Sequence, residues 1–181
     1  ATRDPRSLFE AVSRLDREKL IDPDQFRIQW YVDAGSKAII MQAATAYPVA
    51  RYMDFFDYVP ASEIPGVLNR SSILLQLANT FASDGPKGFM TTKLFESMAV
   101  GKPLLCVKSD ESCLEATIRN TRSGLAARTA EEAFRFILHH YQFWQDNGYT
   151  HINTDKEAVE RFSRKKQAEQ FMRIFTRLNS K

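Results

Sequence analysis

The sequence predicts an α/β protein: a parallel, Rossmann-like sheet with helices on both faces. Segments typical of strands alternate along the chain with segments typical of amphipathic helices, and short connections join them. One strand segment, "SILLQLAN" (72–79), is apolar almost throughout, which is typical of a strand buried on both faces of a parallel sheet. The chain has 181 residues, which is enough for one domain with a substantial core.

The first half of the chain begins with a helix and then alternates strands and helices. Asp4 and Pro5 favour a helix start, because Asp caps the first turn and Pro fits its first position. The segment "FRIQWYVD" is rich in aromatic and β-branched residues and therefore favours a strand. The predicted elements are a helix after Pro5, a strand at 26–33, a helix at 36–46, a strand at 53–59 and a helix at 61–70.

The second half continues the alternation after strand 72–79 and a polar loop. Thr129 and Glu132 have the spacing of a capping box, which starts a helix. The predicted elements are a helix at 91–100, a strand at 103–108, a helix near 111–120, a short strand at 124–127 and a helix from Thr129 toward Asn147.

The last segment, 155–178, predicts one long amphipathic helix docked on the domain, because its apolar residues fall largely on one stripe. These residues are Val159, Phe162, Phe171, Ile174, Phe175 and Leu178.

The composition excludes several classes of protein. A net charge of +3 is too small to argue for nucleic-acid binding, and the basic segment "RFSRKKQ" (161–167) is interpreted as a solvated helix face. Cys106 and Cys113 are too few for a disulfide scaffold and lack metal-ligand spacing, so we expect reduced thiols in a cytoplasmic protein. No apolar stretch is long enough to cross a bilayer, and no signal peptide is visible. The chain lacks an initiating Met, so we expect it to be part of a longer protein.

A binding site is expected where the central strand ends, because ligands of parallel α/β sheets bind outside the carboxyl ends of the strands. Two glycines, Gly85 and Gly88, and two hydroxyl residues, Thr91 and Thr92, precede or begin helix 91–100. The free N–H groups and the positive dipole end of a helix bind anions, and Lys93 adds positive charge there. The pattern indicates a phosphate site.

Glu96 adds a second function to the same helix. It lies four positions after Thr92, so both side chains project from one helix face. A carboxylate beyond a phosphate site can accept hydrogen bonds from the vicinal hydroxyls of a ribose, which favours a nucleoside diphosphate as ligand. The spacing leaves an alternative open: a surface ion pair between Lys93 and Glu96, with a threonine as a plain cap. The side expected to be buried comprises Leu94, Phe95, Met98 and Ala99.

The segment "TTKLFESMAVGKPLL" (91–105) resembles the signature of the large family of retaining nucleotide-sugar glycosyltransferases with the two-domain GT-B fold. The family pattern is a glutamate, seven residues, a second glutamate, and a helix ending A-x-G-x-P before an apolar strand. Glu96 matches the second glutamate, and residues 99–103 match the helix exit. The segments 3–12, 57–77, 113–127 and 160–171 resemble other family elements, in the same order.

The resemblance departs from the family at one position. Gly88 stands where the family has its first glutamate, which contacts the donor sugar, so the catalytic residue is unknown. Arg3 falls where the family has a basic phosphate contact, and the backbone at Val59 and Pro60 falls where the base binds. The donor-binding residues that the resemblance implies are Arg3, Val59, Pro60, Gly88, Phe89, Met90, Thr91, Thr92, Lys93 and Glu96.

By this resemblance, residues 1–181 form a single nucleotide-sugar-binding domain, one half of a GT-B fold. The N-terminal acceptor domain and the first strand of this domain are expected to lie outside the chain. The full protein would transfer a sugar from a UDP- or GDP-type donor to a glycan or lipid-linked acceptor with retention, and the isolated chain would be inactive. No cofactor and no metal are expected. Membrane contact is expected only in the full-length enzyme.

Two other functions remain open. A sugar-nucleotide epimerase of the same fold would share the phosphate site, and a non-catalytic α/β interaction module would not need it. His139 and His140 are adjacent on a predicted helix, where side chains point about 100° apart, so they are interpreted as structural rather than metal-binding. An aromatic cluster is interpreted as strand core, with outward members free to stack on a base. It comprises Tyr52, Phe55, Phe56 and Tyr58.

Overall fold

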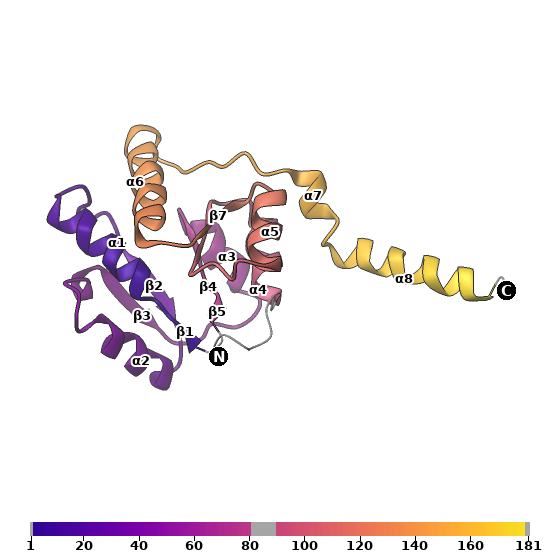
Figure 1. Cartoon of the computed structure of the whole chain (residues 1–181), viewed down its shortest axis with the longest axis horizontal. Helices are drawn as coiled ribbons and strands as arrows, with labels where there is room; N and C mark the ends of the chain where they lie inside the picture. Colours follow the sequence, from indigo (N-terminus) through magenta and orange to yellow (C-terminus); the bar gives the residue numbers. More distant parts are fainter. Residues whose placement is uncertain (1, 81–89, 180–181) are drawn as a thin grey trace.

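The computed structural model describes residues 2–80 and 90–179 (Figure 1). Two predicted donor-site residues, Gly88 and Phe89, lie outside the described residues, as does Gly85. The elements are β1 (Thr2–Arg3), α1 (Arg6–Arg17), β2 (Ile28–Tyr31), α2 (Ala34–Ala44), the 3₁₀ helix η1 (Ala50–Tyr52), β3 (Met53–Phe56), α3 (Ile64–Arg70), β4 (Leu74–Leu77), β5 (Asn79–Thr80), α4 (Thr92–Val100), β6 (Leu104–Val107), α5 (Cys113–Asn120), β7 (Gly124–Ala127), α6 (Ala130–Asn147), α7 (Lys156–Glu160) and α8 (Arg164–Asn179).

Parallel pairing arranges the described strands into two sheets. β2 pairs with β3, and β4, β6 and β7 form a three-stranded sheet in the order β4-β6-β7. β1 pairs antiparallel with β5, which places Arg3 opposite Asn79, just beyond the carboxyl end of β4. The predicted parallel α/β fold is confirmed, with its strands divided between two sheets.

Helices cover both faces of the three-stranded sheet, and the side chains of β6 show this division directly. Leu105 and Val107 belong to a core cluster with α1 and α6, whereas Leu104 and Cys106 belong to a second cluster with α4 and α5. All four are buried, because this central strand is covered on both faces. The first cluster extends through Ile28 to the β2–β3 sheet, so α1 and α6, which pack together, connect the two sheets.

Side-chain caps explain where two of the helices begin. The carboxylate of Asp33 accepts a hydrogen bond from the N–H of Ser36 at 2.9 Å, so α2 begins at Ala34, before the predicted start at 36. The capping residue predicted for α6 is confirmed, since Thr129 accepts from the N–H of Glu132. None of the helices in residues 2–80 and 90–179 is long and apolar enough to cross a membrane.

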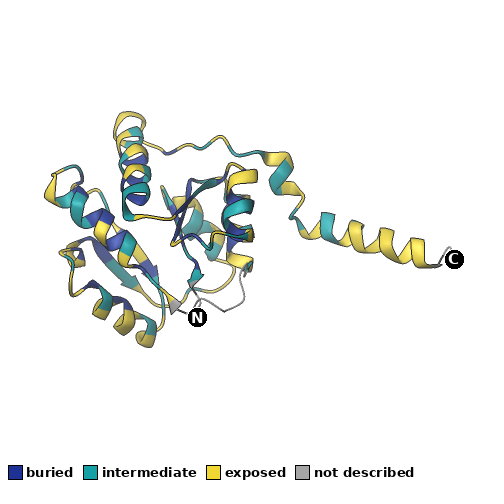
Figure 2. Cartoon of the chain, in the orientation of Figure 1, coloured by how far each residue is buried: buried dark blue, intermediate teal, exposed yellow. Residues whose placement is uncertain are grey.

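The prediction of one docked helix over 155–178 is wrong in two respects. The segment forms α7 and α8, and α8 extends away from the body of the molecule (Figures 1 and 2). The first helix ends at Glu160, and Ser163 caps the second, because its hydroxyl accepts from the N–H of Lys166. Val159 and Phe162 do pack against the second core cluster, as predicted for a docked segment. The other four residues of the predicted stripe are exposed: Phe171, Ile174, Phe175 and Leu178.

Candidate functional site

The amino end of α4 lies at the carboxyl edge of the three-stranded sheet, because α4 connects β5 to the parallel strand β6. Thr91 is the N-cap residue, but its side chain makes no capping hydrogen bond. Its hydroxyl oxygen is buried and has no hydrogen-bond partner in residues 2–80 and 90–179. Within the described residues, Thr91 therefore provides no side-chain acceptor for the first N–H groups of α4, which suits an anionic ligand.

Lys93 and Glu96 are both exposed on the first turns of α4, and both line the same groove. Neither forms an ion pair with the other or with any residue in the described part of the chain. The surface ion pair that the spacing left open is therefore absent from the described structure. A lysine and a carboxylate remain available to a ligand.

The inner side of α4 differs from the prediction at one position. Leu94 and Met98 are buried as expected, but Ala99 is exposed and Ser97 is buried. The reason is the helical period, since residues three and four positions apart face the same way and 94, 97 and 98 form one stripe. Phe95 is partly buried and stacks on Phe162 of the segment after α7, with ring centroids 5.4 Å apart.

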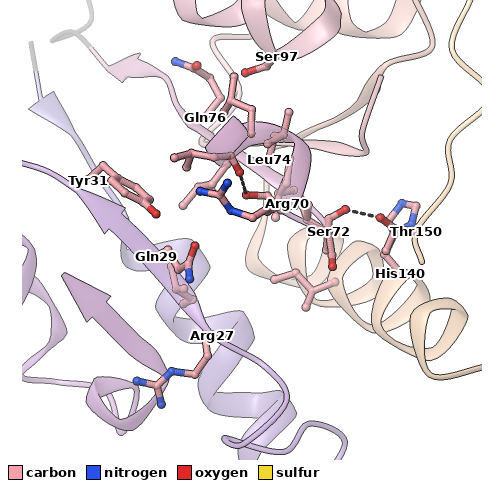
Figure 3. Close-up of a pocket in the computed structure, with 18 of the residues that line it drawn as sticks. Arg27, Gln29, Tyr31, Arg70, Ser72, Leu74, Gln76, Ser97, His140 and Thr150 are labelled. Carbon is pink, nitrogen blue, oxygen red and sulfur yellow. Dashed lines mark hydrogen bonds between the residues drawn. The ribbon is translucent and has the colours of Figure 1, made fainter. Parts of the chain in front are cut away.

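The groove has a volume of about 770 Å³ and lies between β2 of one sheet and β4 of the other (Figure 3). At the carboxyl end of the strands it is lined by Lys93 and Glu96 from α4, by Val59 from the segment after β3, and by two tyrosines. Figure 3 shows Tyr31 on the β2 side facing Gln76 and Ser97 across the groove. The structure thus brings three predicted residues, Val59, Lys93 and Glu96, to one cavity.

Other predicted donor-site residues lie near this rim but outside the groove lining. Thr92 and Pro60 are exposed, and Met90 is partly buried against the second core cluster. Arg3 is exposed on β1, and its Nε donates to Asn79 Oδ1 at 3.2 Å. Because β1 pairs with β5, Arg3 lies at the carboxyl edge from which α4 also begins.

Tyr31 lines the groove and was missed by sequence reasoning, whereas Tyr58 belongs to the aromatic cluster whose outward members were expected to be free to stack on a base. Tyr58 is 69% exposed rather than part of the strand core, and its hydroxyl donates to Asp33 Oδ2 at 3.0 Å. Hydrogen bonds from the backbone and side chain of Ser36, followed by the one from Tyr58, lower the pKa of Asp33 to about 2. Tyr31 stacks on Phe56, with centroids 4.9 Å apart. Tyr31 is the last residue of β2, and Tyr58 lies two residues after the end of β3. Because ligands of parallel sheets bind outside the carboxyl ends of the strands, these positions were the sequence signal for a site residue.

Two acidic residues after β6, Asp110 and Glu115, already form hydrogen bonds or an ion pair within the chain. Asp110 accepts hydrogen bonds from the backbone N–H groups of residues 112, 114 and 115, so its carboxylate is held at the start of α5. Glu115 accepts from Ser109 at 2.5 Å and pairs with Arg128 at 2.8 Å, and these contacts, Arg128 foremost, lower the pKa of Glu115. Within residues 2–80 and 90–179, no three His, Cys, Asp or Glu side chains are grouped to hold a metal ion.

His140 is a buried residue of α6, in agreement with its structural interpretation. Its ring packs edge-on against Phe136, with centroids 4.5 Å apart. Burial, and secondarily the neighbouring His139, lowers the pKa of His140 to about 4, so the ring is neutral at pH 7. His140 lines the groove at the end opposite α4 (Figure 3).

The sequence matches no protein-family model and no curated protein. Among solved structures, sucrose-phosphate synthase from Thermosynechococcus elongatus is similar, with a TM-score of 0.64 and 13% sequence identity. The similarity covers 98% of this chain and 43% of that one, so this chain spans less than half of its length. At this identity the likeness shows the fold alone: a parallel α/β fold with helices on both faces.

Proposed function

We propose that the chain is the donor-binding domain of a retaining glycosyltransferase, which transfers a sugar from a UDP- or GDP-type donor to a glycan or lipid-linked acceptor. The observation that carries the proposal is the pair Lys93 and Glu96. Both are exposed on the first turns of α4, both line one groove, and neither has a charged partner in the described chain. The glycosyltransferase-like fold supports the same conclusion.

The proposed roles follow from the chemistry of the leaving group. A departing nucleoside diphosphate accumulates negative charge, which the amino end of α4, Lys93 and Arg3 would stabilise. The carboxylate of Glu96 would accept hydrogen bonds from the two ribose hydroxyls. The backbone at Val59 and Pro60 would line the base pocket. We assign no residue to the chemistry at the anomeric carbon, since Gly88 stands where the family has a glutamate.

The partners in this proposal are the nucleotide-sugar and an acceptor-binding domain outside the chain. No metal is needed, because the cationic side chains and helix amides supply the charge that faces the diphosphate. Nucleic acid is not a partner. Membrane contact belongs to the full-length enzyme alone. The isolated chain binds donor without transferring sugar.

The test is nucleotide titration of the 181-residue chain, with UDP and GDP, by calorimetry and thermal unfolding. A nucleotide at a hundred times its Kd should stabilise the chain by about 2.7 kcal/mol. In Glu96→Gln, binding should weaken by about 10-fold or more, since hydrogen bonds to charged groups contribute roughly 1.5–3 kcal/mol. The loss should vanish with the 2′,3′-dideoxy nucleotide, which has no hydroxyls for Glu96 to hold.

Controls separate this site from general charge effects. Glu10→Gln removes an exposed carboxylate from α1 and should leave nucleotide binding unchanged. Lys93→Met should weaken UDP, GDP and inorganic pyrophosphate alike, because it acts on the phosphates. Chelation with EDTA should leave binding intact. If neither nucleotide binds, or if Glu96→Gln and Glu10→Gln behave alike, the proposed function is wrong.

A further inference from the structure

The helix α2 is unusually apolar for a helix that is largely exposed. Its 11 residues include one charged side chain, Lys37, and only Ile40 and Ala44 are buried. Ile39 is 65% exposed and Met41 is 41% exposed (Figure 2). A surface helix normally carries charged residues on its outer face, and a helix that is apolar on all sides is normally buried. The outer face of α2 therefore suits a protein partner.

α2 lies beside a free strand edge. Within residues 2–80 and 90–179, β2 is the only strand paired with β3, and Figure 1 shows α2 and β3 together at the end of the molecule opposite α8. The Nζ atom of Lys37 lies 5.1 Å from the ring centroid of Phe55, so α2 covers the face of β3 that carries Phe55. An unpaired strand edge is a template for a strand of another chain.

Alternate residues of β3 direct their backbone groups to this edge. The N–H of Val32 donates to the carbonyl of Phe56 at 3.1 Å, so the backbone groups of Phe56 point toward β2. The backbone groups of Phe55 therefore point away from β2. A strand that continues through Asp57, which directly follows β3, directs the backbone groups of Asp57 the same way.

The charges at this edge are complementary to those of a second copy. Lys37 and Asp57 are both exposed, and neither forms an ion pair in the described part of the chain. Side chains two positions apart on a strand share a face, so Asp57 lies on the same face as Phe55, which Lys37 covers. A two-fold axis brings the lysine of each copy to the aspartate of the other, which forms two ion pairs. A partner of one sign of charge would satisfy only one of the two residues.

We propose that α2 and the edge of β3 bind a second copy of the chain, with the two β3 strands antiparallel. In the register that places Phe55 opposite the partner's Asp57, both residues direct backbone groups across the edge, and Lys37 lies beside the partner's Asp57. The two copies then share one sheet, and their α2 helices lie on the same face of it. This inference goes beyond the proposed function and does not rest on it.

The same register gives the exposed ring of Phe56 a partner. Phe56 is 41% exposed and stacks on Tyr31, on the face of the sheet opposite α2. In this register Phe56 lies opposite the partner's Phe56, at a position without backbone hydrogen bonds, where side chains of antiparallel strands approach most closely. Pairing of the copies therefore buries apolar groups on both faces of the shared sheet.

The test is sedimentation equilibrium of the 181-residue chain and of charge-reversal variants. Lys37→Glu and Asp57→Lys each place like charges together twice in the dimer, so each should raise the dimer Kd by about 10-fold or more. An equimolar mixture of the two variants should dimerise with a Kd within about 3-fold of the original, because both ion pairs return in the mixed dimer. Lys156→Glu is the matched control: it reverses an exposed charge on α7 and should leave the Kd unchanged.

Residue-resolved amide hydrogen exchange by NMR locates the surface. As the protein concentration rises through the dimer Kd, the amides of Phe55 and Asp57 should exchange at least about 10-fold more slowly. The amide of Phe56 should change little, because its backbone groups already pair with β2. Deleting residues 168–181 should leave the dimer Kd unchanged, because α8 takes no part in the proposed contact.

Four outcomes would overturn the proposal. The chain would sediment as a monomer at every concentration up to that of the NMR sample, or Lys37→Glu would dimerise as tightly as the original chain. The mixture of Lys37→Glu and Asp57→Lys would stay monomeric while the original chain dimerises. Loss of the dimer on deletion of residues 168–181 would show that the copies associate through the exposed apolar side chains of α8 instead.

Discussion

We expect the addition of a single methyl group at Gly124 to destabilise the fold strongly. Gly124 begins β7 and lies opposite Leu104 of β6 in the parallel register. A Cβ atom at 124 would lie 1.8 Å from the carbonyl oxygen of Leu104 and 2.6 Å from its carbonyl carbon. Contacts between carbon and carbonyl oxygen normally occur at about 3.3 Å or more, so the strands would have to separate by roughly 1.5 Å.

That displacement cannot be absorbed by a flexible side chain, because the atoms in contact belong to the backbone. It would disrupt the pairing that includes the hydrogen bond from the N–H of Leu104 to the carbonyl of Ser123, which is 3.0 Å long. We expect Gly124→Ala to lower the free energy of unfolding by about 3 kcal/mol or more, at the upper end for overpacked sites. For a chain of this length, this corresponds to a fall in Tm of roughly 6–12 °C.

Gly101→Ala is the matched control, measured in the same thermal and urea unfolding experiments. Gly101 has a φ of +72°, and nothing lies within 4 Å of the place that an added Cβ atom would take, so it tests backbone strain without a steric clash. The left-handed conformation should cost about 1–2 kcal/mol for alanine. A Gly124→Ala protein that is no less stable than Gly101→Ala would refute the reasoning about β7.

Three further predictions concern the core and the C-terminal helix. Burial lowers the pKa of His140 to about 4, so as pH falls from 6.5 to 4 this histidine takes up a proton in the unfolded chain but not in the folded one. The free energy of unfolding should therefore drop by up to about 3 kcal/mol across that window, and by less in His140→Phe. Equal slopes of Tm against pH in the two proteins would contradict this. At pH 8 the native protein should react with a thiol reagent at Cys113, which is exposed, and not at Cys106, because burial raises the pKa of the Cys106 thiol to about 12. A Cys113→Ser protein that still shows one reactive thiol would contradict this prediction. Deleting residues 168–181 should change Tm by less than about 2 °C, because the apolar side chains of α8 are exposed; a fall above about 5 °C would show that the helix is packed.

Local patterns in the sequence were sufficient to predict the strands of the two parallel sheets, most of the helices and part of the candidate site, but not the short antiparallel pair of β1 and β5. The apolar runs at 72–79 and 103–108 indicated parallel strands, because strands covered on both faces cannot alternate in polarity. The helical period placed Thr92 and Glu96 on one face, and both are exposed in the structure. Such features depend on residues within one or two turns of each other.

Tertiary structure alone decided which distant residues meet. Tyr58 and Val59 join Glu96 in one groove because of the order of the strands, which no local pattern encodes. The apolar stripe around Phe171 reads as a docked helix in sequence, yet periodicity reports only that a face is apolar and not what covers it. The division into two sheets follows the same rule, because which strands pair with β2 and with β4 is decided by the fold and not by a local pattern.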